Sequence, residues 1–211
     1  MTSSLAVERV SRPFSEVLGA LAEADGERLS INEVVTAFGE RGFGAIMLLV
    51  GLFNLLPLPP GGTTVTGAPL LLLSAQLMLG RETVWLPGRL CRASVSRESF
   101  RSGLKRVLPW LQRAERLTRP RMTWAVTGPA EQLIGLACFL LSCVLVLPIF
   151  LGNVAPAVAI VVMSLALVQR DGVLALVGWG VVAVAVALLV LAWSVIAAGA
   201  VSGYRWITNR F

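Results

Sequence analysis

Five long apolar segments, separated by polar or Pro/Gly-rich stretches, set the pattern of hydrophobic and polar positions along this chain. They cover residues 42–57, 63–79, 132–151, 153–168 and 173–201. Within each segment the apolar residues lack the regular polar gaps of a one-sided surface helix, so the pattern predicts helices that are apolar all round. Such helices lie in a membrane or in a large core, and the last segment is long enough to cross a bilayer.

Composition decides between these two settings in favour of the membrane. Apolar residues make up 56% of the chain, charged residues 14%, and the mean hydropathy is +0.78. A soluble domain has about 25% charged residues. We therefore expect an all-α integral membrane protein. The polar segment 1–41 contains a capping box, Ser30 with Glu33, which predicts a short helix ahead of the first apolar segment.

An internal repeat relates the first and third apolar segments. Residues 40–61 align without a gap on residues 131–152, and both share the frame E-x3-G-x12-P-x3-G. Ser74 corresponds to Ser164 further along, and "GRE" at 80–82 resembles "QRD" at 169–171. The coincidence of Glu, Gly and Pro is stronger evidence than matching leucines. The repeat predicts two equivalent helical hairpins, each broken at a Pro/Gly hinge.

Two geometries fit these hairpins equally well. Segment 42–57 would be about 24 Å long as a helix, whereas a hydrocarbon core is about 30 Å thick. The arms are therefore either short membrane-spanning helices or re-entrant ones whose hinges stop inside the membrane. Broken backbone at membrane depth needs cover from protein or a water-filled cavity. Polar hinge residues either cap the freed backbone groups or line a transport site.

The distribution of charge predicts the orientation of the chain. Eleven of the 18 Lys and Arg residues lie between Arg81 and Arg121, and the net charge is +6. The positive-inside rule places this stretch in the cytoplasm, so no nucleic-acid partner is needed to explain the charge. We expect a cytoplasmic helical segment (1–41), a first hairpin (42–82), a basic linker (83–131), a second hairpin (132–172) and a C-terminal transmembrane helix with a short tail (173–211).

The basic linker contains an amphipathic pattern. Phe100, Leu104, Leu108 and Leu111 recur at helical spacing, with basic residues on the other faces. This predicts a helix on the cytoplasmic membrane surface, kinked at Pro109. It would be a tether between the hairpins or would bind anionic lipid headgroups. The candidate headgroup residues are Arg101, Lys105 and Arg106.

Catalytic chemistry is poorly represented in the sequence. The chain has no histidine, and its three cysteines show no CxxC spacing, which argues against His-based nucleophilic sites and zinc sites. We expect no enzyme activity, no metal and no cofactor.

Ionisable residues at the ends of the apolar segments are the remaining functional candidates. They are either interfacial anchors or members of a transport site, in which arginine binds phosphate and a carboxylate carries a proton. The candidate transport residues, hinge included, are Glu40, Arg41, Asn54, Pro57, Pro59, Pro60, Gly61, Thr63, Thr64, Gln76, Arg81, Glu82, Glu131, Pro148, Gly152, Asn153, Pro156, Arg170 and Asp171.

Several of these stretches resemble one bacterial family. "GERGFGAIMLL", "NLLPLPPGGTTVTGAPLLLLSAQLMLGRETVWLP", "AERLTRPRM" and "LPIFLGNVAPAVAI" are similar to the exopolysaccharide synthesis ExoD family of bacterial inner-membrane proteins, over roughly residues 10 to 200. In the family a second proline often follows the second hinge proline, whereas Ile149 and Phe150 follow Pro148 here. The resemblance implies a protein of the bacterial inner membrane that takes part in exopolysaccharide production. The apolar segments and the charge distribution predict that it is multi-pass, with its N-terminus in the cytoplasm.

The resemblance implies no particular reaction, so three functions stay open. The first is a small transporter or flippase-like protein for an anionic or lipid-linked precursor, such as a polyprenyl-phosphate-linked one. The second is an accessory protein without transport activity that scaffolds a synthesis complex. The third is a proton or ion exchanger whose effect on the polysaccharide is indirect. The bilayer is the expected partner, and a homodimer would help to cover the polar hinges.

Overall fold

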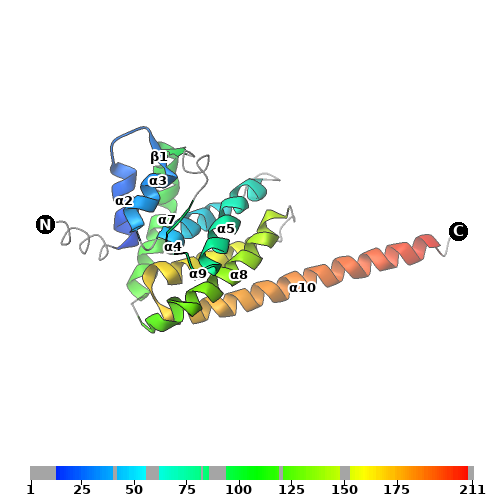
Figure 1. Cartoon of the computed structure of the whole chain (residues 1–211). Helices are drawn as coiled ribbons and strands as arrows, with labels where there is room; N and C mark the ends of the chain where they lie inside the picture. The colour runs from blue at the N-terminus through cyan, green and yellow to red at the C-terminus, as the bar shows by residue number, and fades with distance from the viewer. Residues whose placement is uncertain are drawn as a thin grey trace.

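The computed structural model describes residues 13–39, 42–55, 62–81, 83–85, 94–118, 121–147 and 153–208. The described residues are mostly helical, as predicted, with one short pair of strands (Figure 1). They form a small polar lobe, a bundle of apolar helices and one long helix that projects from the bundle. The lobe and the bundle are the two parts that position the candidate site.

The lobe brings together the segments before and between the two hairpins. It consists of α2 (Phe14–Glu23), β1 (Arg28–Ser30), α3 (Ile31–Phe38), β2 (Ser94–Ser96) and α7 (Arg97–Leu117). The strands pair antiparallel, with Leu29 opposite Val95. The predicted capping box begins α3, since the Ser30 hydroxyl accepts from the backbone N–H of Glu33 and the Glu33 carboxylate accepts from the backbone N–H of Ser30.

Helix α7 occupies the linker segment in which the amphipathic pattern occurs, and it continues through Pro109. Its apolar face is buried in protein: Leu104 and Leu111 share one hydrophobic cluster with Leu18 of α2, Leu48 and Val168. This differs from the prediction of a helix that lies on the membrane surface. The amphipathic period alone does not distinguish a lipid neighbour from a protein neighbour, because both bury one apolar stripe.

The bundle is formed by the arms of the two hairpins. Helices α4 (Gly42–Asn54) and α5 (Gly62–Met78) belong to the first, α8 (Pro129–Val146) and α9 (Val154–Gln169) to the second. Among the four arms, the most extensive contacts join an arm of one hairpin to an arm of the other, α5 to α8 and α4 to α9. Exchanging the two hairpins leaves this pairing unchanged, which is the arrangement that a duplicated unit would produce.

Two glycines that the sequence repeat pairs with each other make these crossed contacts close. A Cβ on Gly135 of α8 would lie 2.5 Å from the backbone N of Met78, at the end of α5. A Cβ on Gly44 of α4 would lie 3.0 Å from the Val168 side chain and 3.2 Å from the Ser164 carbonyl oxygen, at the end of α9. Small residues let helix backbones approach in this way. The start of each first arm therefore packs on the end of the other hairpin's second arm.

The second arms end in the same backbone motif. In α5, Gly80 has a φ of 68° and the N–H of Arg81 donates to the Gln76 carbonyl oxygen. In α9, Arg170 has a φ of 50° and the N–H of Asp171 donates to the Ala166 carbonyl oxygen. Both are left-handed C-caps. They make Gly80 the structural counterpart of Arg170, one residue away from the pairing of "GRE" with "QRD" that the sequence suggested.

Helix α10 (Gly172–Thr208) has 37 residues and is about 56 Å long. It packs on α9 through its first half, where Ala175, Val182 and Ala185 are buried. Beyond the bundle it projects alone (Figure 1), and its apolar side chains are exposed, Trp193 by 73%. Two helices of the described chain are long and apolar enough to cross a membrane, Pro129–Val146 and Gly172–Gly199.

Candidate functional site

Most of the hinge lies outside the described part of the chain. This applies to Glu40, Arg41, Pro57, Pro59, Pro60, Gly61, Glu82, Pro148 and Gly152. Thr63 and Thr64 belong to the first turn of α5, and Arg106 to α7, but the positions of their side chains are not described. The candidate residues that the structure describes fall into a hinge-side group and a lobe-side group.

At the hinge side, two asparagines bond to backbone carbonyls. Asn54 is buried at the end of α4, and its amide donates to the Val50 carbonyl oxygen at 2.8 Å. Asn153 is buried before α9, and its amide lies 3.5 Å from the carbonyl oxygens of Leu145 and Leu147. Pro156 is buried in the first turn of α9, where a missing N–H leaves no helical bond unmade. Of the two roles predicted for the polar hinge residues, capping of backbone groups and lining of a transport site, these contacts correspond to the first.

Gln76 positions the segment that follows α5. Its side chain is buried, its amide N–H donates to the Trp85 carbonyl oxygen at 2.8 Å, and its carbonyl oxygen accepts from the Trp85 N–H at 2.8 Å. Both bonds go to the backbone of Trp85. The indole ring of Trp85 takes no part in them, and the residue is 56% exposed.

Asp171 and Arg170 lie at the junction between α9 and α10. Asp171 is buried, and its carboxylate accepts from the N–H groups of Val173 at 2.9 Å and Leu174 at 3.3 Å. It is therefore the N-cap of α10. Arg170 ends α9 in the left-handed conformation and acts electrostatically on Glu131.

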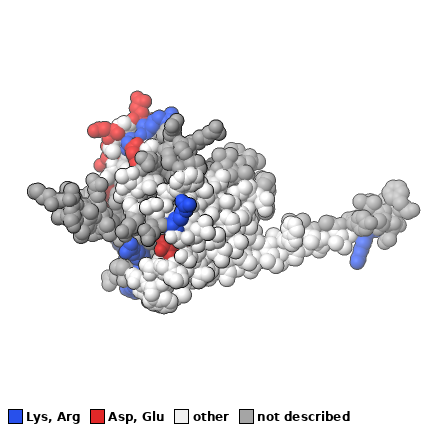
Figure 2. All heavy atoms as spheres, viewed as in Figure 1, with Lys and Arg blue, Asp and Glu red and all other residues white. Residues whose placement is uncertain are grey.

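Arg81 and Glu131 lie together at the lobe-side end of the bundle. Glu131 is in the first turn of α8 and half-buried, whereas Arg81 follows α5 and is exposed. The end of α5 lies against the start of α8, since a Cβ on Gly80 would lie 2.5 Å from the Gln132 side-chain nitrogen. Figure 2 shows a basic and an acidic group close together on a surface that otherwise carries few charges.

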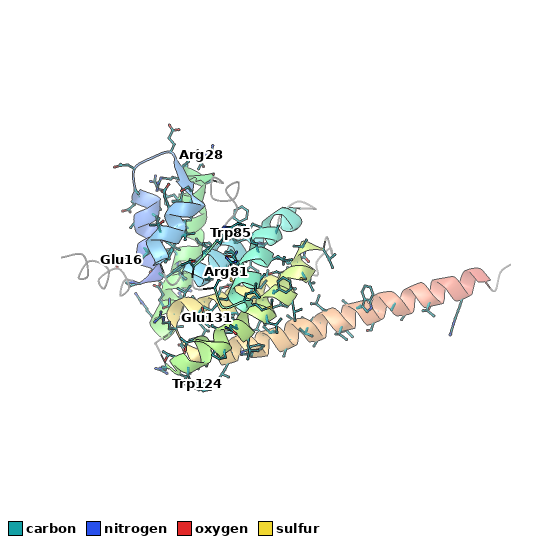
Figure 3. All side chains as sticks on the ribbon, in the orientation of Figure 1. Glu16, Arg28, Arg81, Trp85, Trp124 and Glu131 are labelled. Carbon is teal, nitrogen blue, oxygen red and sulfur yellow. The ribbon has the colours of Figure 1, made fainter. Side chains whose placement is uncertain are left out.

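Two exposed tryptophans flank this pair. Figure 3 shows Trp85, Arg81, Glu131 and Trp124 in sequence across the lobe-side end of the bundle. Trp124 belongs to η2 (Thr123–Val126), which packs on α8 and α10, and it is 69% exposed. Tryptophan at the edge of an apolar surface is typical of a membrane–water interface. Neither tryptophan is among the predicted site residues. The position of Trp85 shortly after "GRE" (80–82) is the sequence signal that could have identified it.

Serines inside the bundle were also missed by the sequence analysis. Ser74, Ser142 and Ser164 are fully buried. The Ser74 hydroxyl donates to the Leu70 carbonyl oxygen at 2.6 Å. The hydroxyls of Ser142 and Ser164 have no hydrogen-bond partner among the described residues. Buried polar groups are rarely left unpaired, so these two hydroxyls are unusual positions within the apolar bundle.

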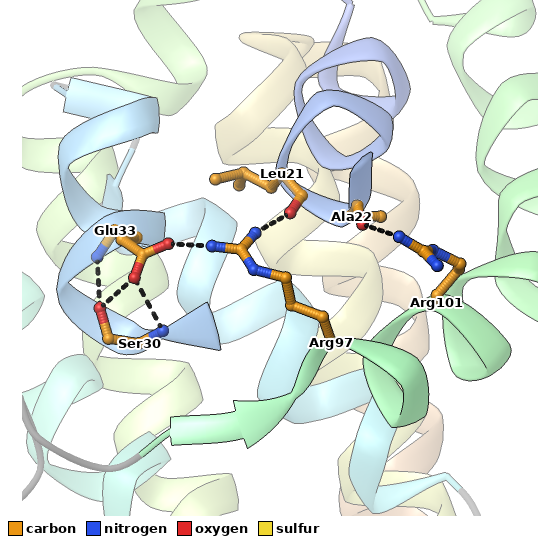
Figure 4. Close-up of polar contacts among 6 residues, drawn as sticks. All are labelled: Leu21, Ala22, Ser30, Glu33, Arg97 and Arg101. Atoms are coloured by element: carbon orange, nitrogen blue, oxygen red, sulfur yellow. Dashed lines mark hydrogen bonds and ion pairs between the residues drawn. The ribbon is translucent and has the colours of Figure 1, made fainter. Parts of the chain in front are cut away.

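The lobe holds its own charges in internal contacts (Figure 4). Arg97 is buried and donates to the Leu21 carbonyl oxygen and to the Glu33 carboxylate, the latter at 2.7 Å. Arg101, a predicted headgroup residue, donates to the Ala22 carbonyl oxygen at 2.8 Å. Lys105 is exposed. The Ser30 hydroxyl, together with the Arg97 guanidinium, holds the pKa of Glu33 below its ordinary value.

The lobe covers the two hairpin seams unequally. Helix α3 contacts α4, and Leu104 and Leu111 of α7 share one hydrophobic cluster with Ala45 and Leu48 of α4 and Val168 of α9. The lobe therefore sits over the α4–α9 seam. At the end of the α5–α8 seam, by contrast, Arg81 is exposed and Glu131 is half-buried. The two seams have similar ends, and the lobe leaves this one accessible.

Comparison with known proteins gives one consistent result. The family model "Exopolysaccharide synthesis, ExoD" matches residues 14–191. Protein ExoD of Rhizobium meliloti (strain 1021) is 31% identical over 195 residues, which cover 89% of this chain and 81% of that protein. An uncharacterized protein of Synechocystis sp. is 28% identical over 154 residues, 72% of this chain and 73% of that protein.

No solved structure shows a significant match to the chain. The family match covers both hairpins, the intervening lobe helix and the first half of α10. The crossed bundle and its accessible end lie within the matched residues, and the chain belongs to the exopolysaccharide synthesis ExoD family.

Proposed function

We propose that this protein is a membrane-embedded transporter or flippase that moves an anionic or lipid-linked precursor during exopolysaccharide synthesis. The observation that carries the proposal is the accessible end of the α5–α8 seam. There an exposed arginine, Arg81, and a half-buried carboxylate, Glu131, lie at the edge of an apolar surface. Ionisable groups at such a position are functional candidates, because burying them near lipid is costly.

The exposed surface of the bundle supports a place in the bilayer. Leu133, Leu136 and Leu140 of α8 are between 39% and 58% exposed. The exposed half of α10 is apolar as well. Contiguous apolar surface of this kind marks a membrane or protein contact. In the proposed orientation Trp85 and Trp124, the tryptophan row, lie at the cytoplasmic headgroup level, and the lobe lies in the cytoplasm.

Helix lengths support a short path across the membrane. The bundle helices have 13, 17, 18 and 16 residues, or about 20 to 27 Å, whereas the hydrocarbon core is about 30 Å thick. In the proposed orientation the hinges therefore end at or inside the far leaflet, as in a re-entrant pair. Helix α10 alone is long enough to extend beyond it.

A proton or ion exchanger is the second candidate, and one observation favours it. The hydroxyls of Ser142 and Ser164, for which the described part of the chain offers no hydrogen-bond partner, lie inside the same bundle as Glu131. Hydroxyls and a carboxylate could relay protons or solvate a small cation between the lobe side and the hinge side. Transport of a precursor and proton exchange are also compatible with each other, since one gradient could drive the other.

Reconstitution separates these functions. Purified protein in liposomes should move a fluorescent polyprenyl phosphate between leaflets, and Glu131→Gln should reduce that flux at least tenfold while the protein stays folded. Proton flux without lipid movement would replace the transporter with the exchanger. Vesicles silent in both assays would overturn the proposal and leave the accessory role.

A further inference from the structure

We infer that the lobe-side end of the α5–α8 seam binds a glycosylated lipid phosphate, that is, a sugar joined through phosphate to a long hydrocarbon chain. The inference rests on the proposed function and names its substrate class. Three adjacent features fit the three parts of such a molecule: Arg81 with Gln132 for the phosphate, Trp85 for the sugar, and the outer face of α8 for the chain.

The phosphate part fits the donors at the end of α5. The guanidinium of Arg81 is exposed, and guanidinium groups bind phosphate through two parallel hydrogen bonds. The Gln132 amide lies over the end of α5, where a Cβ at position 80 would come within 2.5 Å of its nitrogen. The amide adds a neutral donor beside the guanidinium. Glu131 is the nearby acid, and the positive charge of Arg170 interacts electrostatically with its carboxylate.

The sugar part fits Trp85. Its indole ring is 56% exposed, while its backbone is fixed by two hydrogen bonds from the buried Gln76. A large exposed ring held on a rigid backbone loses little conformational freedom when it binds a ligand. The flat apolar C–H face of a pyranose stacks on such a ring, and its hydroxyls can bond to the Glu131 carboxylate and the Gln132 amide.

The chain part fits the outer face of α8, which begins at the same end. Gln132, Leu136 and Leu140 lie four residues apart, so they share one face of the helix. Leu133 is exposed beside Gln132 at the start of this stripe, and Leu147 is exposed at its hinge-side end. A hydrocarbon chain laid along this stripe would start at the phosphate donors and run toward the far leaflet, in the direction in which a lipid would have to move.

The combination favours this ligand over a simple anionic lipid or a soluble sugar phosphate. A phospholipid would use the arginine and the stripe but would leave the fixed tryptophan unused. A soluble sugar phosphate would use the polar end but none of the leucines. Each of the three contacts can therefore be tested by removing the matching part of the ligand.

The experiment measures binding to the full-length protein in nanodiscs by native mass spectrometry. The probes are a polyprenyl phosphoryl hexose, polyprenyl phosphate, phosphatidylglycerol and a soluble hexose 1-phosphate. We expect the glycosylated lipid to bind most tightly and the soluble sugar phosphate not to bind. Arg81→Gln should weaken both polyprenyl ligands by about tenfold to a hundredfold. Trp85→Ala should reduce the glycosylated lipid to the affinity of polyprenyl phosphate.

Matched variants control for general effects. Arg116→Gln removes an exposed arginine of the lobe, and Trp124→Ala removes the second exposed tryptophan of the row; both should bind as the wild type does. Trp85→Ala removes only the ring, because Gln76 holds the backbone. Three results would each overturn the inference. They are phosphatidylglycerol binding as tightly as the polyprenyl phosphoryl hexose, tight binding of the soluble hexose 1-phosphate, and a Trp85→Ala variant that binds the glycosylated lipid as tightly as the wild type does.

This outcome can be told apart from failure of the proposed function. Binding with the predicted pattern but no flux in liposomes would overturn transport and leave the site standing. Flux of the polyprenyl phosphoryl hexose that is unaffected by Arg81→Gln and Trp85→Ala would overturn the site and leave transport standing.

Discussion

Single residues at the helix contacts determine how closely the two hairpins approach. Gly135 has backbone atoms of Leu77 and Met78 within 3.0 Å of the position of a Cβ, so the α5–α8 seam has no room for a side chain there. Gly180 of α10 has nothing within 4 Å of that position. The same chemical change at these two glycines should therefore have opposite effects.

Gly135→Ala should lower the free energy of unfolding by about 1–3 kcal/mol, because the added methyl forces α5 and α8 apart. Gly180→Ala should be neutral or stabilising by up to about 1 kcal/mol, because alanine favours the helix. Thermal unfolding in a mild detergent compares the two. Equal midpoints for both variants would show that the seam is looser than described.

The carboxylate of Glu33 links lobe stability to pH. Its pKa is lowered by the Ser30 hydroxyl and the Arg97 guanidinium, so the folded state favours the ionised form. Its contribution is then complete above the unfolded-state pKa of about 4.3 and is lost as the pH falls through the lowered folded-state pKa. The difference in midpoint between the wild type and Glu33→Gln should shrink below about pH 4.3. A difference that is constant across pH would contradict this linkage.

Residue roles were only partly predictable from the sequence. Asp171 precedes a glycine and a long apolar run, which is an N-cap signal, yet it was interpreted as a possible transport residue. Gln76 and Trp85 are nine residues apart along the chain, but nothing local shows their double hydrogen bond. Arg97 bonds to groups 76 and 64 residues away, and one sequence contains no signal for such contacts.

At the scale of elements, α7 holds α2 at both ends. The Glu115 carboxylate accepts from the backbone N–H and the hydroxyl of Ser15, at the start of α2. Arg97 and Arg101 donate to the carbonyl oxygens of Leu21 and Ala22, at its end. An acid at the N-terminus and bases at the C-terminus both complement the helix dipole. The short helix is thereby stabilised by its antiparallel neighbour.

Glu115→Ala should destabilise the protein by about 1–2 kcal/mol, because it removes the acceptor at the start of α2. Glu27→Ala, at an exposed acid outside the helices, is the control and should change the free energy of unfolding by less than about 0.5 kcal/mol. Chemical denaturation followed by circular dichroism measures both. A Glu115→Ala variant as stable as the control would contradict a stabilising role for the Glu115–Ser15 hydrogen bonds.

The elements themselves were more predictable than their neighbours. Apolar runs and the capping box located the bundle helices and α3, because those signals lie within the elements. The strand pair was not foreseen, since β1 and β2 are three residues each and lie far apart in the sequence. The burial of α7 depends on α2 and α4, so its own pattern could not reveal it.

At the scale of the whole molecule, a bundle with crossed helix pairs carries an asymmetric cover. The crossed packing of α5 on α8 and α4 on α9 treats the hairpins alike, whereas the lobe covers one seam and α10 packs on α9. The sequence repeat suggested that the two hairpins are equivalent. They differ in their neighbours, because the lobe covers one seam and α10 packs mainly on α9. This asymmetry is what leaves the end with Arg81 and Glu131 accessible.

The proposed orientation predicts that the lobe and the end of α10 lie on opposite sides of the membrane. In a background with the native cysteines replaced, Ser202→Cys should react with an impermeant thiol reagent in intact spheroplasts. Ser102→Cys, on the exposed face of α7, should react only after lysis. Reaction of both cysteines before lysis, or of neither, would contradict an α10 that crosses the bilayer.

The most direct test of the central claim is the amount of exopolysaccharide secreted by cells that depend on this protein. Arg81→Gln and Glu131→Gln should each lower secretion at least tenfold at matched levels of folded membrane protein, while Arg116→Gln should preserve it. Wild-type secretion from both seam variants would contradict a functional site at the α5–α8 end.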